Sequence, residues 1–412
     1  MKDSPASQIL LLTGTRPGHD GVGAILLSDQ LGFLPPGSVD VVHVVTSDEP
    51  VGAASLDVSS RGFMTVSVPR HKTGDGGRLH RFVRSLSNEI AAQRGIKRAI
   101  EAICAHVQDG GTREVWAVLD TPQSIQMAPL LARALRVPLK AMVWDDIEHQ
   151  IMYFGLGRVA ARHCRRAFVA ALRDAETLAV IGESMRDAYE VRFGKRGTIV
   201  RHGVAPPKAS AMDGTSDVIR IGFAGSVTAR SAFDCLLAAL DQANWMIDGR
   251  LITLVLMGGR FDLRSNVPRR IEYLGWRSPE ETLAILASCT VNYLPQPFEL
   301  DWRAFAELSF PSKASTYLAA GVPILVQAPE WASLPRFNVH HPFAVTCTEL
   351  DPRRLLACLQ SLVTDGQLRT KALAGASATL EAAFSVERFR KDFMTFIDGC
   401  AQPDAGVSGA RA

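Results

Sequence analysis

The chain has 412 residues, more than one hydrophobic core ordinarily organises, so two domains are the first expectation. Its composition, 47% hydrophobic and 21% charged, is that of a globular protein, and a net charge of +3 argues against a nucleic-acid partner. No stretch reaches the roughly 20 apolar residues of a membrane-spanning helix, and the opening sequence MKDSPASQILLLTG has too short an apolar run for a signal peptide.

Short apolar runs alternate with helical segments along the whole chain. Most of the runs are continuous, a pattern typical of parallel strands that are buried on both faces. Strand–helix alternation therefore predicts an α/β protein with two doubly wound, Rossmann-like parallel sheets. The predicted strands are 8–14, 40–47, 64–70, 114–120, 139–146, 177–183, 198–204, 218–225, 251–259, 271–276, 291–296, 323–327 and 343–348.

The Pro-, Ala-, Ser- and Gly-rich stretch at 205–217 predicts the boundary between the two domains. We expect an N-terminal domain over 1–205, a C-terminal domain over 206–384, and a disordered tail at 401–412. Ligands of such sheets bind at the carboxyl ends of strands, and two facing sheets form a cleft. Functional residues are therefore expected in the loops that follow strands.

The segment 78–103 is predicted to be a helix with a basic face. Charged residues recur on one side of it, and an apolar stripe runs along another. One interpretation is a solvated face over a core stripe; the other is a docking surface for an anionic acceptor or an acidic membrane leaflet. The charged face comprises Arg94, Lys97, Arg98 and Glu101, and the stripe comprises Leu79, Val83, Leu86 and Ile90.

The loop GTRPGHDGVG follows the first strand and is rich in glycine. Gly21 and Gly23 are expected to open a helix, where exposed backbone amides suit an anion. The spacing is not G-x-G-x-x-G, so the dinucleotide fingerprint is absent. A plain tight turn is the alternative.

The sequence VWDDIEHQ places acidic residues at the end of another predicted strand. Asp146 has the position of a helix cap. The alternative for Asp145 and Asp146 is a role at a reaction centre, as an acceptor-orienting group or general base.

A third loop, FAGSVTARS, brings Gly225 and Ser226 to a strand end, with Arg230 shortly after. The guanidinium group is a fork of donors that matches phosphate. A surface arginine beside a turn is the alternative.

The stretch FPSKASTYLAAGVPIL predicts a loop, a short helix and a buried strand. Pro311 ends the preceding segment, Ser312 is expected to cap the helix, and Gly321 to end it. Lys313 then lies in the first turn, where a cation is unfavourable unless it faces an anion. Its ammonium group and the nearby amides would form an anion trap suited to phosphate. In the alternative, Lys313 bends away into solvent.

This last stretch resembles the Pro–Ser–Lys and Glu–Tyr–Leu–Ala–Ala–Gly segment of the GT-B glycosyltransferases of the retaining family-4 type. The segments IRIGFAGSVTARSAFDCLLAAL and IEYLGWRSPEETLAILASCTVNYLPQ are similar to other parts of that family's C-terminal domain. Further back, AETLAVIGESMRDAYEVRFGKRGTIVRHGV resembles the end of its N-terminal domain. The resemblance implies that a helix at 385–400 packs back on the N-terminal domain.

The resemblance also implies a retaining transfer of sugar from a nucleotide-sugar to a surface polysaccharide, a glycolipid or a metabolite. Lys313 would bind the donor diphosphate, with Gly21 and Gly23 under the same phosphates. No metal or cofactor is implied, because cationic side chains and helix amides neutralise the leaving diphosphate. The remaining donor-binding residues would be Gly225, Ser226, Arg230, Pro311, Ser312 and Thr316, and Asp145 lies roughly where the family has a histidine.

Thr316 departs from the family, which has a ribose-binding glutamate at that position. Two other functions therefore stay open. One is a binding subunit that kept the fold and lost the chemistry. The other is a nucleotide-sugar epimerase or nicotinamide oxidoreductase, with Asp48 after the second strand as the ribose-binding acid.

Seven cysteines are scattered along the chain without a C-x-x-C pair. Their odd number and spacing argue against a disulfide framework or a zinc site and favour the reducing cytosol. They are Cys104, Cys164, Cys235, Cys289, Cys347, Cys358 and Cys400.

Overall fold

The computed structural model describes residues 8–19, 21–47, 62–69, 78–107, 111–205, 217–259 and 270–399. Within α2 the side chains are described from residue 86 onward. The chain forms two compact units. Unit 1 takes in the residues up to Ile181, Met185–Val200 and those from Arg390 on, and unit 2 comprises Gly182–Ser184 and Arg201–Phe389. The expected boundary stretch 206–216, the tail 401–412 and Asp48 lie outside the described residues.

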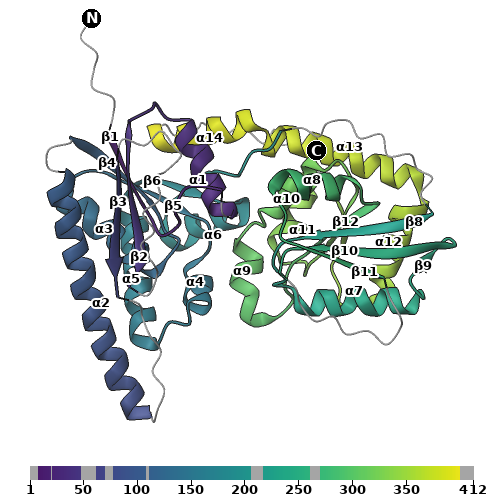
Figure 1. The fold of residues 1–412 in the computed structure, drawn as a ribbon, viewed down its shortest axis with the longest axis horizontal. Helices are drawn as coiled ribbons and strands as arrows, with labels where there is room; N and C mark the ends of the chain where they lie inside the picture. The colour runs from purple at the N-terminus through teal and green to yellow at the C-terminus, as the bar shows by residue number, and fades with distance from the viewer. Residues whose placement is uncertain are drawn as a thin grey trace, which may run out of the picture. The chain divides into compact units, whose positions relative to one another are not determined.

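Unit 1 is built on a parallel sheet with the order β3-β2-β1-β4-β5-β6-β7 (Figure 1). Its core strands are continuous apolar runs because helices cover the sheet; β5 is buried at all five positions. The strands are β1 (Gln8–Thr13), β2 (Val39–Thr46), β3 (Gly62–Val68), β4 (Thr112–Val118), β5 (Leu139–Val143), β6 (Ala175–Val180) and β7 (Thr198–Ile199).

Three of the helices on this sheet, α2, α3 and α5, pack against one another. The helices of this part of the chain are α1 (Val22–Gly32), α2 (Arg78–Val107), α3 (Pro122–Leu135), α4 (Ile147–Tyr153), α5 (Arg158–Asp174) and α6 (Glu183–Phe193).

Unit 1 is completed by α14 (Val386–Asp398), the last helix that the structure describes, from Arg390 onward. The Phe393 ring lies 5.1 Å from that of Trp116, a fully buried side chain of β4, and 6.2 Å from that of Phe33 at the end of α1. Lys140 of β5 is buried, pairs with Glu114 at 3.0 Å, and donates a hydrogen bond to the carbonyl oxygen of Ile397. These contacts attach the C-terminal helix to the first sheet.

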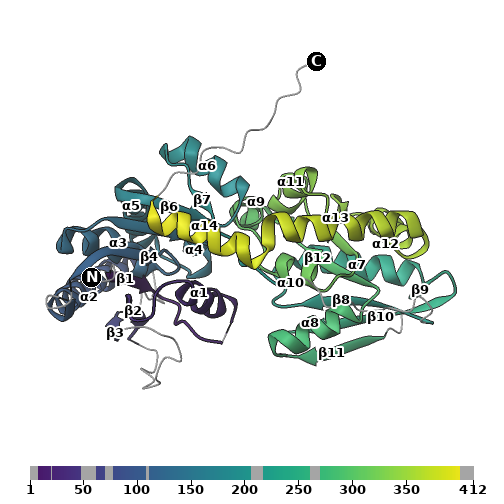
Figure 2. The same ribbon diagram turned by 90° about the horizontal axis from the view of Figure 1, so that it is seen from above.

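Unit 2 repeats the same winding, with the order β11-β10-β8-β12-β13-β14. Figure 2 labels β8, β10, β11 and β12 of this sheet. Numbered within each unit, and with the short antiparallel β9 left out, both sheets therefore begin 3-2-1-4-5-6, the order of a doubly wound fold. The strands are β8 (Val218–Ala224), β10 (Arg250–Met257), β11 (Ile271–Gly275), β12 (Val291–Pro295), β13 (Ile324–Gln327) and β14 (Val345–Cys347), all parallel; the short β9 (Met246–Ile247) pairs antiparallel with β10.

Helices line both faces of the second sheet. α7 packs against α12, whereas α10 packs against α8 and α13. The helical segments are α7 (Arg230–Gln242), α8 (Pro279–Ala287), η1 (Leu300–Trp302), α9 (Arg303–Leu308), α10 (Lys313–Ala319), α11 (Ser333–His340), α12 (Pro352–Thr364) and α13 (Gly366–Phe384). The predicted fold class, two doubly wound parallel sheets, is confirmed.

The expected core stripe of α2 is wrong where it can be checked. Leu86 and Ile90 are 43% and 45% exposed, and Leu79 and Val83 fall among the side chains that are not described. Other positions of α2, Ala92, Ile96, Ala99 and Ile103, are the ones buried in the core. The predicted charged face is exposed throughout, at Arg94, Lys97, Arg98 and Glu101.

No helix among the described residues combines the length and the apolar character that a membrane span needs.

Candidate functional site

Lys313, the first residue of α10, lies at the point where the winding of the second sheet reverses, between β8 and β12. Its ammonium group donates a hydrogen bond of 2.7 Å to the carbonyl oxygen of Ser226 and lies 4.6 Å from the centre of the Phe223 ring. Burial lowers the pKa of Lys313 from 10.5 to about 8. A cation kept at a desolvation cost beside a neutral carbonyl is poised to be stabilised by an anion.

Glycine is required at the end of β8 for this arrangement. Gly225 has φ +108°, and a Cβ built there would lie 2.5 Å from Cε of Lys313. Gly258, at the end of β10, has φ +113°, and its Cβ would lie 2.7 Å from the carbonyl oxygen of Gly225. The ends of the neighbouring strands β8 and β10 therefore come so close beside Lys313 that neither glycine has room for a side chain. The Tyr317 hydroxyl completes the contact by accepting a 2.8 Å hydrogen bond from the amide of Ala224.

The predicted capping role of Ser312 is wrong in its chemistry. Ser312 occupies the position before α10, but its own φ and ψ are helical and its side chain makes no capping hydrogen bond. Its carbonyl oxygen accepts a hydrogen bond from the Ser315 hydroxyl at 2.8 Å. Thr316 is half-buried and lies one helical turn after Lys313, so the two side chains share a face of α10. Pro311 precedes them and is also half-buried.

Arg230 is the first residue of α7 and points along the helix to Asp234, with 3.6 Å between Nε and Oδ1. Both side chains are about half exposed, so this is a weak surface ion pair.

Glu299 is a residue of this region that the sequence reasoning missed. It follows β12, and its Oε1 accepts a 3.1 Å hydrogen bond from the amide of Ser231 in the first turn of α7. Its Oε2 is buried and has no hydrogen-bond partner within the described ranges. Only the position of an acidic residue soon after a predicted strand could have indicated it.

In unit 1 the winding reverses between β1 and β4, and Asp120 is the second residue after β4. Its carboxylate accepts hydrogen bonds from the amide of Gly14 at 2.9 Å, the Thr13 hydroxyl at 3.2 Å and the Ser124 hydroxyl at 3.0 Å. Gly14 itself has no room for a side chain, because a Cβ would lie 2.2 Å from Cγ2 of Thr121. Asp120, also missed from the sequence, thus fixes the start of the glycine-rich loop.

The glycine-rich loop ends at α1, as predicted. Gly21 is the residue before this helix, has φ +101°, and has open space around its Cβ position. A Cβ on Gly23 would lie 3.0 Å from the Trp144 ring, so this glycine permits a close approach to the loop after β5. The first amides of α1 have no side-chain cap.

Asp146 is fully buried at the start of α4, and its hydrogen bonds occupy both carboxylate oxygens. Oδ1 accepts from the amide of Glu148 at 3.0 Å. Oδ2 accepts from the Tyr189 hydroxyl at 3.0 Å and from Nη1 of Arg192 at 3.1 Å. The helix-capping interpretation therefore describes this residue.

Asp145 is half-buried and lies beside His149. Burial lowers the pKa of His149, while the charges of Asp145 and Asp146 act in the opposite direction. A neutral imidazole next to a partly exposed carboxylate is a pair that can accept and hold a proton.

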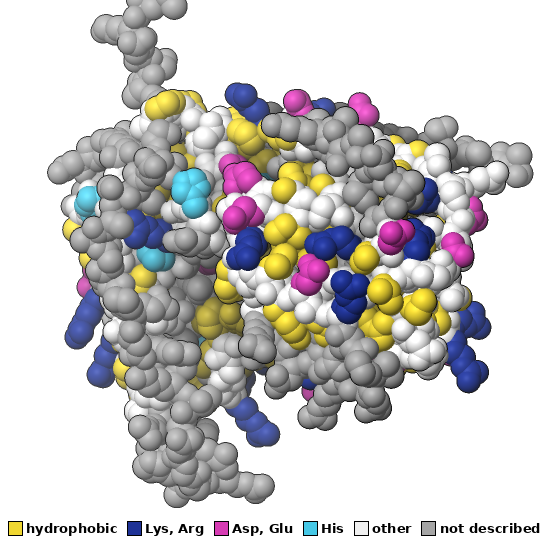
Figure 3. Space-filling model, turned by 45° about the vertical axis from the view of Figure 1, so that its right-hand side comes forward, with side chains coloured by type: hydrophobic (Ala, Val, Ile, Leu, Met, Phe, Trp, Pro, Cys, Tyr) yellow, Lys and Arg dark blue, Asp and Glu magenta, His cyan; other side chains and the backbone are white. Residues whose placement is uncertain are grey.

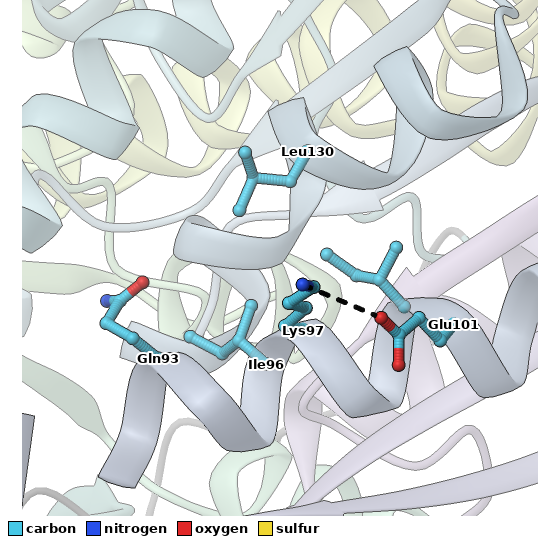
Figure 4. A pocket seen from close by; sticks show the side chains of 6 residues that line it. Gln93, Ile96, Lys97, Glu101 and Leu130 are labelled. Carbon is cyan, nitrogen blue, oxygen red and sulfur yellow. Dashed lines mark ion pairs between the residues drawn. The ribbon is translucent and has the colours of Figure 1, made fainter. Parts of the chain in front are cut away.

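A separate hollow of about 440 Å³ lies on the surface of unit 1, between α2 and α3 (Figure 4). Lys97 and Glu101 form a loose ion pair at 4.0 Å on its α2 side, and Leu130 of α3 lies opposite. Gln93, Ile96 and Ile100 complete the lining. None of the predicted catalytic or donor-binding residues lines it.

Charged side chains of both signs are interspersed with apolar ones on the face of the molecule shown in Figure 3. Within the described ranges, no group of three or more His, Cys, Asp or Glu side chains is arranged to hold a metal ion.

No protein-family model matches the chain, and no curated protein matches its sequence. Solved structures do match its fold. Anabaena HepE in complex with UDP and glucose is similar with a TM-score of 0.66 at 14% identity, over 95% of this chain and 99% of that one. Sucrose-phosphate synthase from Thermosynechococcus elongatus is similar with a TM-score of 0.64 at 16% identity, over 95% and 98%.

A third similar structure is the UDP-forming alpha,alpha-trehalose-phosphate synthase from Burkholderia xenovorans in complex with glucose-6-phosphate. Its TM-score is 0.62 at 12% identity, over 95% of this chain and the whole of that one. At these identities the likeness concerns the fold. The chain therefore has the GT-B fold, with two Rossmann-like parallel sheets, that these structures share.

Proposed function

We propose that this protein is a glycosyltransferase that moves a sugar from a nucleotide-sugar donor to an acceptor, with retention of configuration. The observation that carries the proposal is the ammonium group of Lys313, 2.7 Å from the Ser226 carbonyl at the switch point of the second sheet. Ligands of doubly wound sheets bind at such points. The complexes of HepE with UDP and with UDP-glucose support a uridine nucleotide as the first donor to test.

Lys313 would stabilise the diphosphate that leaves during transfer. Negative charge grows on the leaving oxygen in the transition state, and a preorganised ammonium group in a partly desolvated position stabilises it most strongly there. Gly225 and Ser226 would line this subsite with backbone groups, with Arg230 as an outer cation. Pro311, Ser312 and Thr316 would shape its α10 side. The first turn of α1, which follows Gly21, contains Gly23 and has no side-chain cap, suits an anion as well.

We assign the acceptor chemistry to Asp145. Its partly exposed carboxylate can orient an acceptor hydroxyl or take its proton, whereas the oxygens of Asp146 are already occupied. Asp146 is thus proposed to act by holding the loop after β5 in place. The acceptor is a sugar, a lipid-linked saccharide or a small molecule.

Calorimetry with UDP, GDP and ADP tests the donor site. Wild type is expected to bind one of them, and Lys313→Ala to bind it at least tenfold more weakly. Lys371→Ala, which removes an exposed lysine of α13, is the matched control and should bind as wild type does. Equal binding by Lys313→Ala and wild type would remove Lys313 from the donor site.

A thermal-shift screen of nucleotide-sugars then identifies the sugar. A ligand present at 100 times its dissociation constant stabilises the protein by about 2.7 kcal/mol. Slow release of the nucleoside diphosphate from the best donor by the purified protein would exclude the non-catalytic alternative.

We also propose that the protein works in the cytoplasm in peripheral contact with an acidic membrane surface, through α2. This helix exposes Leu86 and Ile90 together with Arg94, Lys97 and Arg98. Exposed apolar and basic side chains on one helix favour an interface with anionic lipid. Co-sedimentation with acidic and with neutral vesicles tests it. Equal, negligible binding to both would leave this face to solvent.

A further inference from the structure

Tyr153, the last residue of α4, presents an aromatic ring to solvent on unit 1. It is 70% exposed, whereas Tyr189, Tyr293 and Tyr317 are fully buried. Single exposed aromatic rings are common on protein surfaces. This one is distinguished by its surroundings, because it lies on the helix that begins beside Asp145, the proposed acceptor carboxylate.

Two neighbouring rings hold the Tyr153 ring in place. The His149 ring lies 5.9 Å from it, with 35° between the two planes. The Phe154 ring lies 5.1 Å from it, edge to face at 86°. The amide of Phe154 also donates a 3.0 Å hydrogen bond to the carbonyl oxygen of Gln150, which closes the last turn of the helix. A ring fixed in this way loses little conformational entropy when a ligand packs on it.

The helix that carries the ring is itself attached to unit 1 at two points. Glu148 and Arg165 of α5 form a two-pronged ion pair, with both N–O distances 2.7 Å. At the start of the helix, the buried Asp146 accepts hydrogen bonds from Tyr189 and Arg192. The Tyr153 ring therefore stands on a rigid support that continues from the end of β5.

Polar and aromatic groups alternate along this short segment. Asp145 is half-buried four residues before His149, and His149 and Tyr153 are one helical turn apart on the same face of α4. Trp144, on the other side of Asp145 in the chain, lies against Gly23, since a Cβ on that glycine would lie 3.0 Å from the Trp144 ring. A carboxylate is thus flanked by aromatic residues, which is a surface with an apolar face and strong hydrogen-bond acceptors.

We propose that Tyr153 is a binding residue for the acceptor, and that the acceptor is a saccharide. One sugar ring packs its C–H face on the Tyr153 ring, and a hydroxyl group of the same saccharide donates to Asp145. C–H bonds carry partial positive charge and suit the negative face of an aromatic ring. A hydroxyl–carboxylate hydrogen bond is among the strong ones. The inference rests on the proposed glycosyltransferase function and narrows its acceptor to one chemical class.

The openness of the ring favours a saccharide over an aromatic alcohol. A flat apolar acceptor gains most from an enclosed pocket that removes both of its faces from water. Tyr153 offers one open face instead, at 70% exposure. A sugar ring can pack its C–H face there and keep its remaining hydroxyl groups hydrated, so it loses few hydrogen bonds to water.

Saturation-transfer NMR on the full chain tests the inference. The probes are methyl α-glucoside, methyl β-galactoside and methyl β-N-acetylglucosaminide, with para-nitrophenol as the aromatic alcohol. Spectra are recorded without nucleotide and again with UDP, GDP or ADP present. We expect at least one methyl glycoside to receive saturation from the wild-type protein, on its ring C–H protons, and para-nitrophenol to receive less.

Variants of Tyr153 identify the surface that the saccharide contacts. Tyr153→Ala should weaken binding of that glycoside about threefold to tenfold, since it removes one ring contact. Tyr153→Phe and Tyr153→Trp should retain binding, because the ring face and not the hydroxyl group makes the contact. Leu130→Ala, which shortens a side chain of α3 that is 43% exposed, is the matched control and should bind as wild type does.

Calorimetry with UDP, GDP and ADP on the same samples separates this inference from the proposed function. Tyr153→Ala should keep the wild-type affinity for the nucleoside diphosphate and the wild-type circular dichroism. If wild type binds none of the three nucleotides, the donor assignment fails, whatever the glycosides do. The inference about Tyr153 is overturned if no glycoside binds, if Tyr153→Ala and wild type bind glycosides equally, if Tyr153→Phe loses as much as Tyr153→Ala, or if para-nitrophenol is the better ligand.

Discussion

The ammonium nitrogen of Lys313 lies 2.7 Å from the carbonyl oxygen of Ser226. The contact joins the start of α10 to the loop after β8, and it is made by a cation whose pKa burial has lowered to about 8. A neutral carbonyl is a weak partner for an ammonium group compared with a phosphate oxygen. We therefore expect Lys313 to contribute more to the free energy of binding an anion than to the free energy of unfolding of the free protein.

Replacing Lys313 should separate binding from folding. A hydrogen bond to a charged group contributes about 1.5–3 kcal/mol, so Lys313→Ala should weaken binding of a nucleoside diphosphate by roughly tenfold to a hundredfold. Calorimetry measures the affinity, and circular dichroism should show an unchanged fold. If a nucleoside without phosphates lost as much affinity as the diphosphate, the lysine would not be a phosphate ligand.

The pH dependence follows from the same group. Its pKa is about 8 in the folded chain and 10.5 ordinarily, so the unfolded state binds more protons between these values, and stability rises with pH through that window. Below pH 8 most of the cost of desolvating this charge is present. Lys313→Met should therefore be more stable than wild type in urea at pH 7.5, with a smaller advantage at pH 9.5. An advantage that grows with pH would contradict this assignment.

The affinity of the free protein for a nucleoside diphosphate should change in the opposite sense. The ammonium form of Lys313 predominates below its pKa of about 8 and is progressively lost above it, so affinity should fall as pH rises from 7.5 to 9.5. The same titration on Lys313→Ala should show a flatter profile, which serves as the control.

Gly225→Ala should damage the same subsite through geometry. A side chain at φ +108° costs about 1–3 kcal/mol, and its Cβ would also displace Lys313. Gly249→Ala is the matched control, because Gly249 has φ +71° but open space around its Cβ position. Both variants should unfold at lower urea, and only Gly225→Ala should lose nucleotide affinity. Equal loss of affinity in both would point to general strain.

The neighbouring aspartates should respond in different ways. Asp146→Ala removes a helix cap and leaves the buried Tyr189 hydroxyl unpaired, which should destabilise the protein by about 3 kcal/mol in urea unfolding. Asp145→Ala should fold normally and lower the rate of transfer once a donor and an acceptor are known. A fully active Asp145→Ala enzyme would exclude the acceptor role.

The sequence was sufficient for the fold because both sheets are buried on two faces. Their strands are largely continuous apolar runs, such as the four buried residues 9–12 of β1, and these stand out without alternation. The two-residue strand β9 was not predicted, because a strand so short has no pattern; it forms through a tight turn at Asp248 and Gly249, both with positive φ.

The wrong stripe on α2 has a physical cause. Two stripes along this helix have helical spacing, and the buried one includes Glu89, which is 2% exposed. A carboxylate is expected on the exposed side of a helix. Here Nδ1 of His163 on α5 lies 2.7 Å from the Glu89 carboxylate, and this contact offsets the free-energy cost of burying it. That partner is 74 residues away in sequence, so local periodicity selects the wrong face.

The candidate site was predictable only in part, for a similar reason. Turn and helix signals in the sequence indicated Lys313 and Gly225. Their steric fit could not be predicted, because it depends on a contact between two residues that are 88 positions apart in the chain. Asp120 carries no local signal, since its partners Gly14 and Thr13 belong to another strand end. Ser312 is expected to cap α10 because serine favours the position before a helix. Its backbone is itself helical, however, and its hydroxyl makes no capping hydrogen bond.

The attachment of α14 to the first sheet bears on how the protein is made. Phe393 covers Trp116, and Ile397 accepts the hydrogen bond of the buried Lys140, so unit 1 lacks part of its core until α14 has been synthesised. A ribosome synthesises the chain from its N-terminus at about 5–20 residues per second, so the N-terminal segments emerge first. The apolar surface of the first sheet around Trp116 therefore stays uncovered while the residues of unit 2 are synthesised.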